Sequence, residues 1–300
     1  MTVRKILTVL AMVLLLPTSP HADIAAAPEV TVIWRSVLGS QLFNLYAPAS
    51  LGNYFCLAGW RGWGDYPTDK IFYGPGLYES IDFPHAHAND PTLVALADGS
   101  WRMYFTYADF SAGNEAENAE IWTARSTDQG STWREIQPLI GRHNGYNNAG
   151  GWEPAALRTA GGVCLWWHGT VPLLGMYRAC FADDGIMQVT PTEPLTVPFQ
   201  LLGPDAAWLP DGRLLMVGSP YGREGFFYLA ALESYDGLTW TPLTGTTDGL
   251  LLSTPGDEII ITPRVTVRPS GNIQILFISR PELLSLGQTT VHEWKIELPR

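Results

Sequence analysis

Charged residues and helical patterns are scarce in this sequence. Only 16% of the 300 residues are charged, with 18 lysines and arginines against 29 aspartates and glutamates. The resulting net charge of −11 argues against nucleic acid or an anionic lipid surface as a partner. Almost no stretch shows the 3.6-residue apolar period of an amphipathic helix, which argues against an α-helical or α/β fold.

Cysteine is also scarce, at three residues: Cys56, Cys164 and Cys180. They cannot all pair, and their spacing contains no C-x-x-C motif that would predict a metal site. Cys164 and Cys180 fall on runs that we interpret below as neighbouring strands. A disulfide formed on export and two buried thiols are both compatible with that placement.

An apolar run lies at the N-terminus. Arg4 and Lys5 precede an uncharged stretch over residues 6–16, and small residues follow at Ala22 and 25–27. This order is typical of a secretory signal peptide, and the run is too short to span a bilayer as a helix. We expect a signal peptide over residues 1–27, cleaved between 22 and 27. Residues 28–300 would then form one exported domain, periplasmic or extracellular, with no membrane span.

Aromatic residues, glycine and proline are abundant and follow a repeat. A proline near the start of an apolar run is followed by a turn with glycine and then by a second, aromatic run. The copies begin at Ala47, Asp90, Glu153, Asp205 and Thr262. The interval of roughly 50 residues is the length of one propeller blade. Turns of the Asp-Gly kind favour hairpins, because glycine tolerates a positive φ.

Further strand candidates follow each copy. Third strands are expected at 70–73, 121–126, 176–181, 226–232 and 291–298, and fourth strands at 133–136, 186–189 and 240–243. The last copy lacks a fourth strand, and the segment 30–34 is available to complete it. A blade shared by both ends of the chain removes an exposed sheet edge. The sequence therefore predicts an all-β, five-bladed β-propeller of four-stranded antiparallel blades, closed by the N- and C-terminal strands.

Two turns between third and fourth strands carry a recurrent motif. Residues 126–133, Ser-Thr-Asp-Gln-Gly-Ser-Thr-Trp, resemble the Asp box of sialidases, and residues 234–240 are a shortened version. We expect the aspartate to accept turn amides, the glycine to adopt a positive φ and the tryptophan to pack beneath the hairpin. These acids are therefore structural rather than catalytic.

Strand direction places the starts of the first strands on one face, together with the loops between second and third strands. Asp90, Glu153 and Asp205 are expected at one repeat position around the axis, and Asp69 reaches the same face from a loop. These four are the candidate catalytic residues. The alternative is that an acid before proline only caps a strand turn.

The same face is rich in residue types that contact sugars. The candidates are Trp60, Trp63, His87, Asn89, Trp152, His168, Tyr221 and Arg264. Aromatic rings stack on the C–H faces of sugars, although core packing is the alternative for any single tryptophan. His85 and His87 lack a second spaced pair, so no metal site is expected.

The order of these motifs resembles a family of enzymes. Asp90-Pro91, Asp98-Gly99 and 104–106, then Trp152-Glu153-Pro154, then Pro204-Asp205 are similar to the five-bladed glycoside hydrolases of families 43, 32 and 117. The resemblance implies inverting hydrolysis of glycosidic, often furanosidic, bonds such as those of arabinan. It implies a base Asp in blade one, a pKa-tuning Asp in blade two and an acid Glu in blade three.

Asp90 and Glu153 fit the second and third of these places. Ala47 stands where the base would be, so the base would come from Asp69, Asp65 or Asp205.

These observations predict a secreted glycoside hydrolase that acts on a polysaccharide or oligosaccharide as a monomer. No cofactor is required, although some such propellers hold an axial cation. One alternative is a non-catalytic carbohydrate-binding propeller, which needs the aromatic residues but not the converging carboxylates. Another is a sialidase-like exo-glycosidase, which needs an arginine cluster; only Arg264 occupies a ring position.

Overall fold

The structure is a computed structural model. It describes residues 30–36, 43–51, 54–61, 69–74, 77–109, 118–141, 150–170, 174–220, 228–244, 246, 249–253, 259–267, 272–280 and 289–296. The expected signal peptide lies outside these residues. Within them, no helix combines the length and apolar character needed to cross a membrane.

The described strands form five antiparallel sheets. The first sheet contains β2 (Phe43–Leu51), β3 (Tyr54–Arg61), β4 (Lys70–Tyr73) and β5 (Glu79–Ile81). The second contains β6 (Ala86–Ala95), β7 (Trp101–Asp109), β8 (Glu120–Ser126) and β9 (Arg134–Ile140). The third contains β10 (Gly151–Thr159), β11 (Gly162–Gly169), β12 (Met176–Phe181) and β13 (Glu193–Pro194).

The fourth sheet contains β14 (Leu201–Trp208), β15 (Leu214–Pro220), β16 (Tyr228–Ser234) and β17 (Thr241–Pro242), and β18 (Leu250–Ser253) also pairs with β16. The fifth contains β19 (Ile259–Val267), β20 (Ile273–Arg280), β21 (Thr289–Ile296) and β1 (Val30–Ser36). The chain is an all-β propeller.

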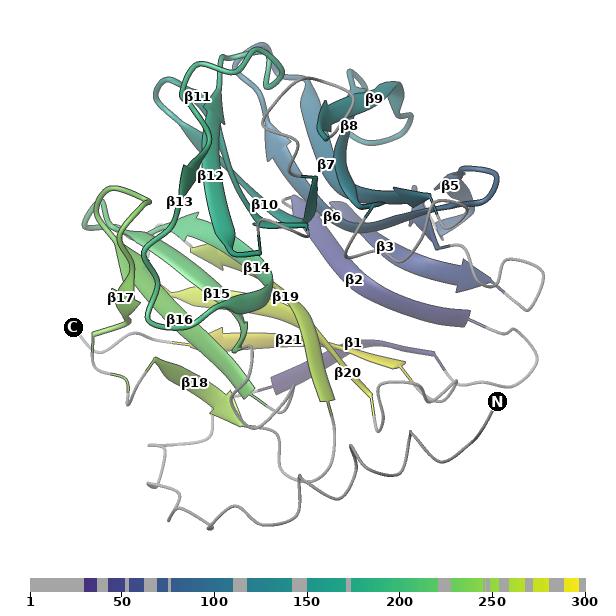
Figure 1. Ribbon diagram of the computed structural model, residues 1–300. Helices are drawn as coiled ribbons and strands as arrows, with labels where there is room; N and C mark the ends of the chain where they lie inside the picture. Colours follow the sequence, from purple (N-terminus) through teal and green to yellow (C-terminus); the bar gives the residue numbers. More distant parts are fainter. Residues whose placement is uncertain are drawn as a thin grey trace, which may run out of the picture.

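The first strand of each sheet lies at the centre of the molecule. β2 contacts β6, β6 contacts β10, β10 contacts β14, β14 contacts β19, and β19 contacts β2. Figure 1 shows these strands converging while β5, β9, β13 and β17 lie at the periphery. Apolar clusters fill the spaces between neighbouring sheets, for example Ile71 with Phe105 and Leu165 with Tyr104. Each sheet therefore buries both faces, which explains the dense apolar runs in its strands.

β1 pairs antiparallel with β21, which is the pairing expected for the segment 30–34. The expected third strands are found, the fourth of them beginning within the described part at Tyr228. The fourth strand predicted at 186–189 is present only as a single bridge between Phe181 and Gln188, and β13 lies at Glu193–Pro194. Asp184 accepts hydrogen bonds from the backbone N–H groups of Ile186 and Met187, which bends this segment into a turn.

The two Asp-containing turns have the expected geometry. Asp128 accepts the backbone N–H of Thr132, and Gly130 has φ +85°. In the second turn, Asp236 accepts the N–H groups of Leu238 and Thr239. These bonds hold the pKa of Asp236 below its usual value. Both carboxylates are thus engaged in turn structure, as the sequence predicted.

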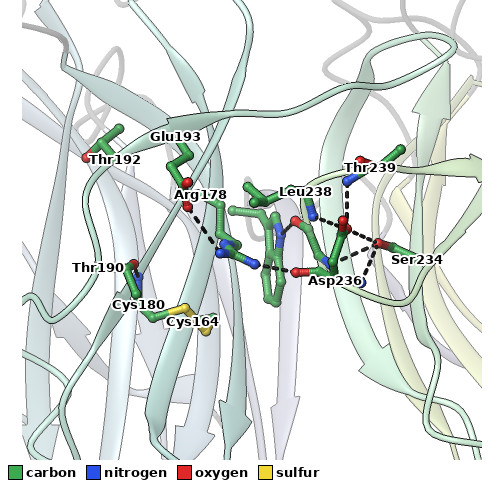
Figure 2. A network of polar contacts seen from close by, with 12 residues as sticks. Cys164, Arg178, Cys180, Thr190, Thr192, Glu193, Ser234, Asp236, Leu238 and Thr239 are labelled. Carbon is green, nitrogen blue, oxygen red and sulfur yellow. Dashed lines mark hydrogen bonds and ion pairs between the residues drawn. A yellow bond between two sulfur atoms is a disulfide. The ribbon is translucent and has the colours of Figure 1, made fainter.

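The second turn also joins two sheets. Arg178 of β12 donates to the carbonyl oxygen of Asp236 and forms an ion pair with Glu193 (3.2 Å). Trp166 of β11 donates its indole N–H to the carbonyl oxygen of Gly237 (2.8 Å). Figure 2 shows Arg178 between Glu193 and Asp236, close to the disulfide of Cys164 and Cys180.

Cys164 and Cys180 face one another across β11 and β12 and form a disulfide, with Cα atoms 4.0 Å apart. The disulfide alternative is therefore the correct one. Cys56 is a buried free thiol, and burial raises its pKa to about 12.

Candidate active site

Every central strand carries a β-bulge where a residue precedes proline. The register shifts at Ala47-Pro48, Asp90-Pro91, Glu153-Pro154, Gly203-Pro204 and Thr262-Pro263. Proline has no N–H to donate to the ladder, so it favours a bulge there. Four of the residues before proline have a positive φ, between +46° and +54°: Asp90, Glu153, Gly203 and Thr262. The five pre-proline positions, from Ala47 to Thr262, are called the ring positions below.

Asp205 does not occupy a ring position, which corrects the sequence interpretation. The ring position of its strand is Gly203, and Asp205 lies two residues further along β14. At the equivalent place in the other strands stand Thr92, Ala155 and Arg264. The residue before proline, rather than the carboxylate, marks the repeat position.

Asp205 and Arg264 form a buried layer beneath the ring positions. The Arg264 guanidinium donates to the carbonyl oxygens of Pro91 (3.0 Å), Pro263 (3.0 Å) and Pro204 (3.4 Å). Asp205 accepts the backbone N–H of Val265 (2.8 Å). Burial raises the pKa of Asp205 to about 6, although the positive charge of Arg264 and the backbone N–H oppose this rise.

The same layer borders a cavity of about 410 Å³. Its walls include Ala49, Val94, Leu157 and Trp208, which come from the later parts of the central strands. The cavity therefore lies at the end of the axis opposite the ring positions. Asp205 and Arg264 line this cavity, whereas Asp90 and Glu153 do not.

Asp90 and Glu153 are brought together through one hydroxyl group. Thr106 of β7 donates from Oγ1 to Oδ2 of Asp90 (3.3 Å) and accepts the backbone N–H of Glu153 (2.8 Å). Thr106 is fully buried, and Asp90 is 5% exposed. Asp90 and Glu153, which belong to neighbouring sheets, thus share the Thr106 hydroxyl as a hydrogen-bond partner.

The Glu153 carboxyl is oriented from the other side by Gly203. The backbone N–H of Gly203 donates to Oε2 of Glu153 (2.8 Å). Gly203 has φ +54°, and a Cβ there would come within 2.9 Å of the Cα of Thr262. Glycine is therefore required for this close approach. Since Oε2 accepts an N–H, Oε1 is the oxygen on which Glu153 can carry a proton.

His168 lies beside the same carboxyl. Its Nε2 is 3.8 Å from Oε2 of Glu153 and bonds the carbonyl oxygen of Leu201. Burial lowers the pKa of His168 to about 4, so the ring is neutral at neutral pH and Nε2 carries a hydrogen. The Trp152 ring packs against the His168 ring, with centroids 5.5 Å apart. The ring beside the Glu153 carboxyl is therefore uncharged.

Asp69 is buried next to His87 at the border of the first two sheets. Oδ2 of Asp69 is 2.6 Å from Nδ1 of His87, and the N–H of Ala88 donates to the carbonyl oxygen of Asp69. Asp69 is only 2% exposed and His87 is also buried, so this pair lies inside the protein. Asn89, also buried, lies between His87 and Asp90 on β6.

Three expected substrate contacts fall outside the described part of the chain: Trp63, Tyr221 and the side chain of Trp60. Asp65, one of the candidate bases, also falls outside it. Among the described residues, no group of three or more His, Cys, Asp or Glu residues has a metal-binding arrangement. The sequence interpretation assigned no role to Thr106, which lies in the 104–106 motif, or to Gly203. The pre-proline repeat marks Gly203, whereas nothing in the 104–106 motif distinguishes the buried hydroxyl of Thr106.

Comparison with known proteins rests on structure. No model of a protein family and no curated protein matches the sequence. Among solved structures, a thermostable family-43 glycoside hydrolase has a TM-score of 0.62 and 14% identity, covering 88% of this chain and 92% of that chain. The native arabinanase Arb43A of Bacillus subtilis has a TM-score of 0.58 and 13% identity, covering 84% and 96%.

An N-acetylgalactosamine deacetylase from F. plautii, solved in complex with blood group B trisaccharide, is also similar. Its TM-score is 0.61 with 13% identity, covering 90% of this chain and 95% of that chain. At these identities the likeness establishes the fold. The chain has the propeller fold of these proteins.

Proposed function

We propose that the protein is an exported, monomeric glycoside hydrolase built as a closed five-bladed propeller, with the five sheets as its blades. The observation that carries the proposal is the carboxyl pair Asp90 and Glu153, held at neighbouring ring positions by Thr106. Two carboxyl groups on either side of a glycosidic bond suffice for its hydrolysis. The substrate class is a polysaccharide or oligosaccharide, arabinan-like in its linkages.

Glu153 is the general acid in this proposal. The Gly203 N–H holds Oε2, so the proton on Oε1 is directed to the leaving glycosidic oxygen. A general acid must hold a proton when the substrate binds, and the neighbouring His168 ring carries no charge.

Asp90 is the second carboxyl group and activates the attacking water. Ala47 occupies the ring position of the first sheet and supplies no acid there. Asp205 is buried beneath the ring, and Asp69 is engaged with His87. Among the described residues, Asp90 is therefore the carboxylate at the ring position next to Glu153. Inversion requires roughly 6.5–9.5 Å between the two carboxyl groups, enough room for the water.

Glu153→Gln tests the assignment on the purified mature protein. We expect reducing-sugar release from arabinan, xylan and galactan panels to fall by about 10²- to 10⁴-fold on the active substrate, because the amide has no proton to transfer to the leaving oxygen. Melting temperature and sugar binding should change little. Glu193→Gln, which lies on β13 at the periphery, is the matched control and should retain full activity. Undiminished turnover in Glu153→Gln would remove Glu153 as the acid.

A non-catalytic carbohydrate-binding propeller is the second candidate, favoured by Ala47 at the ring position where the resemblance implies a base. It predicts sugar binding by the wild-type protein without release of reducing ends. Calorimetric titration with oligosaccharides, run beside the activity panel, separates the two functions.

A further inference from the structure

We infer that Thr106 is a positioning residue that couples the two carboxyl residues of the site. Its hydroxyl is the common partner of Asp90 and Glu153, which belong to different sheets. The inference rests on the proposed function for its catalytic consequence. Its structural part, the fixing of both ring positions by one hydroxyl, stands on the hydrogen bonds alone.

The hydrogen-bond chemistry of the hydroxyl fixes the direction of its proton. A threonine hydroxyl has one proton to donate and two lone pairs that accept. The backbone N–H of Glu153 can only donate, so Oγ1 of Thr106 accepts it at 2.8 Å. The single hydroxyl proton is then directed to Oδ2 of Asp90 at 3.3 Å. Donation to Asp90 favours its ionised form, which is the form a base needs.

The backbone at both ring positions requires support of this kind. Asp90 has φ +48° and Glu153 has φ +52°, in a region that non-glycine residues seldom occupy. Such conformations persist where the surroundings fix them. Thr106 pairs with Asn89 in the β6–β7 ladder, so its own position is set by the neighbour of Asp90. From there it reaches across to β10 and holds the Glu153 amide.

The local chain of contacts runs across three sheets. Asp90 in the second sheet is bonded to Thr106, Thr106 to the Glu153 amide in the third, and the Glu153 carboxyl to Gly203 in the fourth. Thr106 is the only side chain among these contacts that is not itself a carboxylate. Removing its hydroxyl therefore breaks the link between the two carboxyl residues without altering either of them.

Thr106→Val and Thr106→Ser test the inference. Valine keeps the shape but removes the hydroxyl, whereas serine keeps the hydroxyl. We expect kcat to fall about 10- to 100-fold in Thr106→Val with KM changed less than threefold. The acidic limb of its pH–rate profile should move to higher pH, because ionised Asp90 loses a donor. Thr106→Ser should restore both.

Thr123→Val is the matched control. Thr123 is also fully buried in the second sheet, and its hydroxyl donates to the Met103 carbonyl oxygen (2.9 Å). The same hydroxyl accepts a hydrogen bond from Nη1 of Arg102 (3.3 Å). Thr123→Val therefore loses two buried hydrogen bonds, as Thr106→Val does, and should lose stability without moving the pH–rate profile. An unchanged kcat and profile in Thr106→Val, or equal changes in Thr123→Val, would overturn the inference.

Hydrogen exchange adds a test that needs no substrate. Exchange of the Glu153 backbone amide, followed by NMR or mass spectrometry of the whole protein, should accelerate at least tenfold in Thr106→Val and stay near wild type in Thr106→Ser. An unaltered rate in Thr106→Val overturns the positioning role. If the wild-type protein releases no sugar from any substrate, the proposed hydrolase function fails, and the exchange rates still decide the role of Thr106.

Discussion

The buried position of Asp205 near the propeller axis changes the pKa of its carboxyl group. Burial raises its pKa to about 6, in spite of the nearby Arg264 and the N–H of Val265. A folded-state pKa above the unfolded value means that the protonated form stabilises the fold. This contribution is complete below about pH 4 and is lost as the pH rises through about 6.

Asp205→Asn should remove this pH dependence. We expect the free energy of unfolding of the wild-type protein to fall by up to about 3 kcal/mol relative to the variant between pH 4 and 7. Urea unfolding followed by tryptophan fluorescence at several pH values measures this difference. Asp211→Asn is the control, because the exposed Asp211 carboxylate is held in a turn by Arg213. This variant should show the same change in unfolding free energy between pH 4 and 7 as the wild-type protein. Parallel curves for wild type and Asp205→Asn would show that Asp205 ionises at its usual pH.

The candidate site was predictable from sequence only in part. Asp90 and Glu153 stand out because an acid precedes proline at the start of a repeated apolar run. Asp205 lies in a different layer from the one that the repeat spacing predicts, because a bulge shifts the register and spacing alone does not reveal it. Gly203 acts through its backbone N–H, and Thr106 through one hydroxyl. Neither atom has a signature in residue type.

Strands differ in how clearly the sequence defines them. The third strands predicted at 70–73 and 176–181 have the bounds that the structure shows. The outer strands are shorter, β13 and β17 having two residues each, and carry little pattern. The turn formed by Asp184 displaced the fourth strand of the third sheet from its expected place.

The disulfide between β11 and β12 should stabilise the third sheet by closing a loop with a sequence separation of 16 residues. We expect the double variant Cys164→Ala/Cys180→Ala to lose about 2–3 kcal/mol of unfolding free energy, measured by urea denaturation. The oxidised and reduced wild-type proteins should differ by a similar amount. Without reductant, one thiol per chain, that of Cys56, should react after unfolding. Equal stability of the double variant would show that the bridge contributes little beyond the strand pairing.

The whole molecule is held by contacts between sheets as much as within them. The four described apolar clusters each take residues from two neighbouring sheets. No sheet has a core of its own, so the sheets stabilise one another around the axis. The fifth sheet further depends on β1, which comes from the opposite end of the chain.

Deletion of residues 28–36 tests this dependence. Without β1, the backbone groups of β21 lose their partner strand, and we expect a loss of several kcal/mol and a melting temperature lower by about 5–10 °C. Differential scanning calorimetry measures the change. A chain that begins at residue 28 is the control and should melt like the mature protein. An unchanged melting temperature in the deletion would show that β1 does not secure the fifth sheet.

Arg264 links two segments of the chain that are synthesised at different times. Its guanidinium holds the carbonyl oxygen of Pro91, which precedes it by 173 residues. At about 5–20 residues per second, Pro91 leaves the ribosome roughly 10 to 35 s before the arginine that binds it. The strand carrying Asp90 and the early blades therefore spend that interval without their final partner. If translation stops before β19, the released chain contains the complete first blades but lacks the arginine that binds the carbonyl oxygen of Pro91.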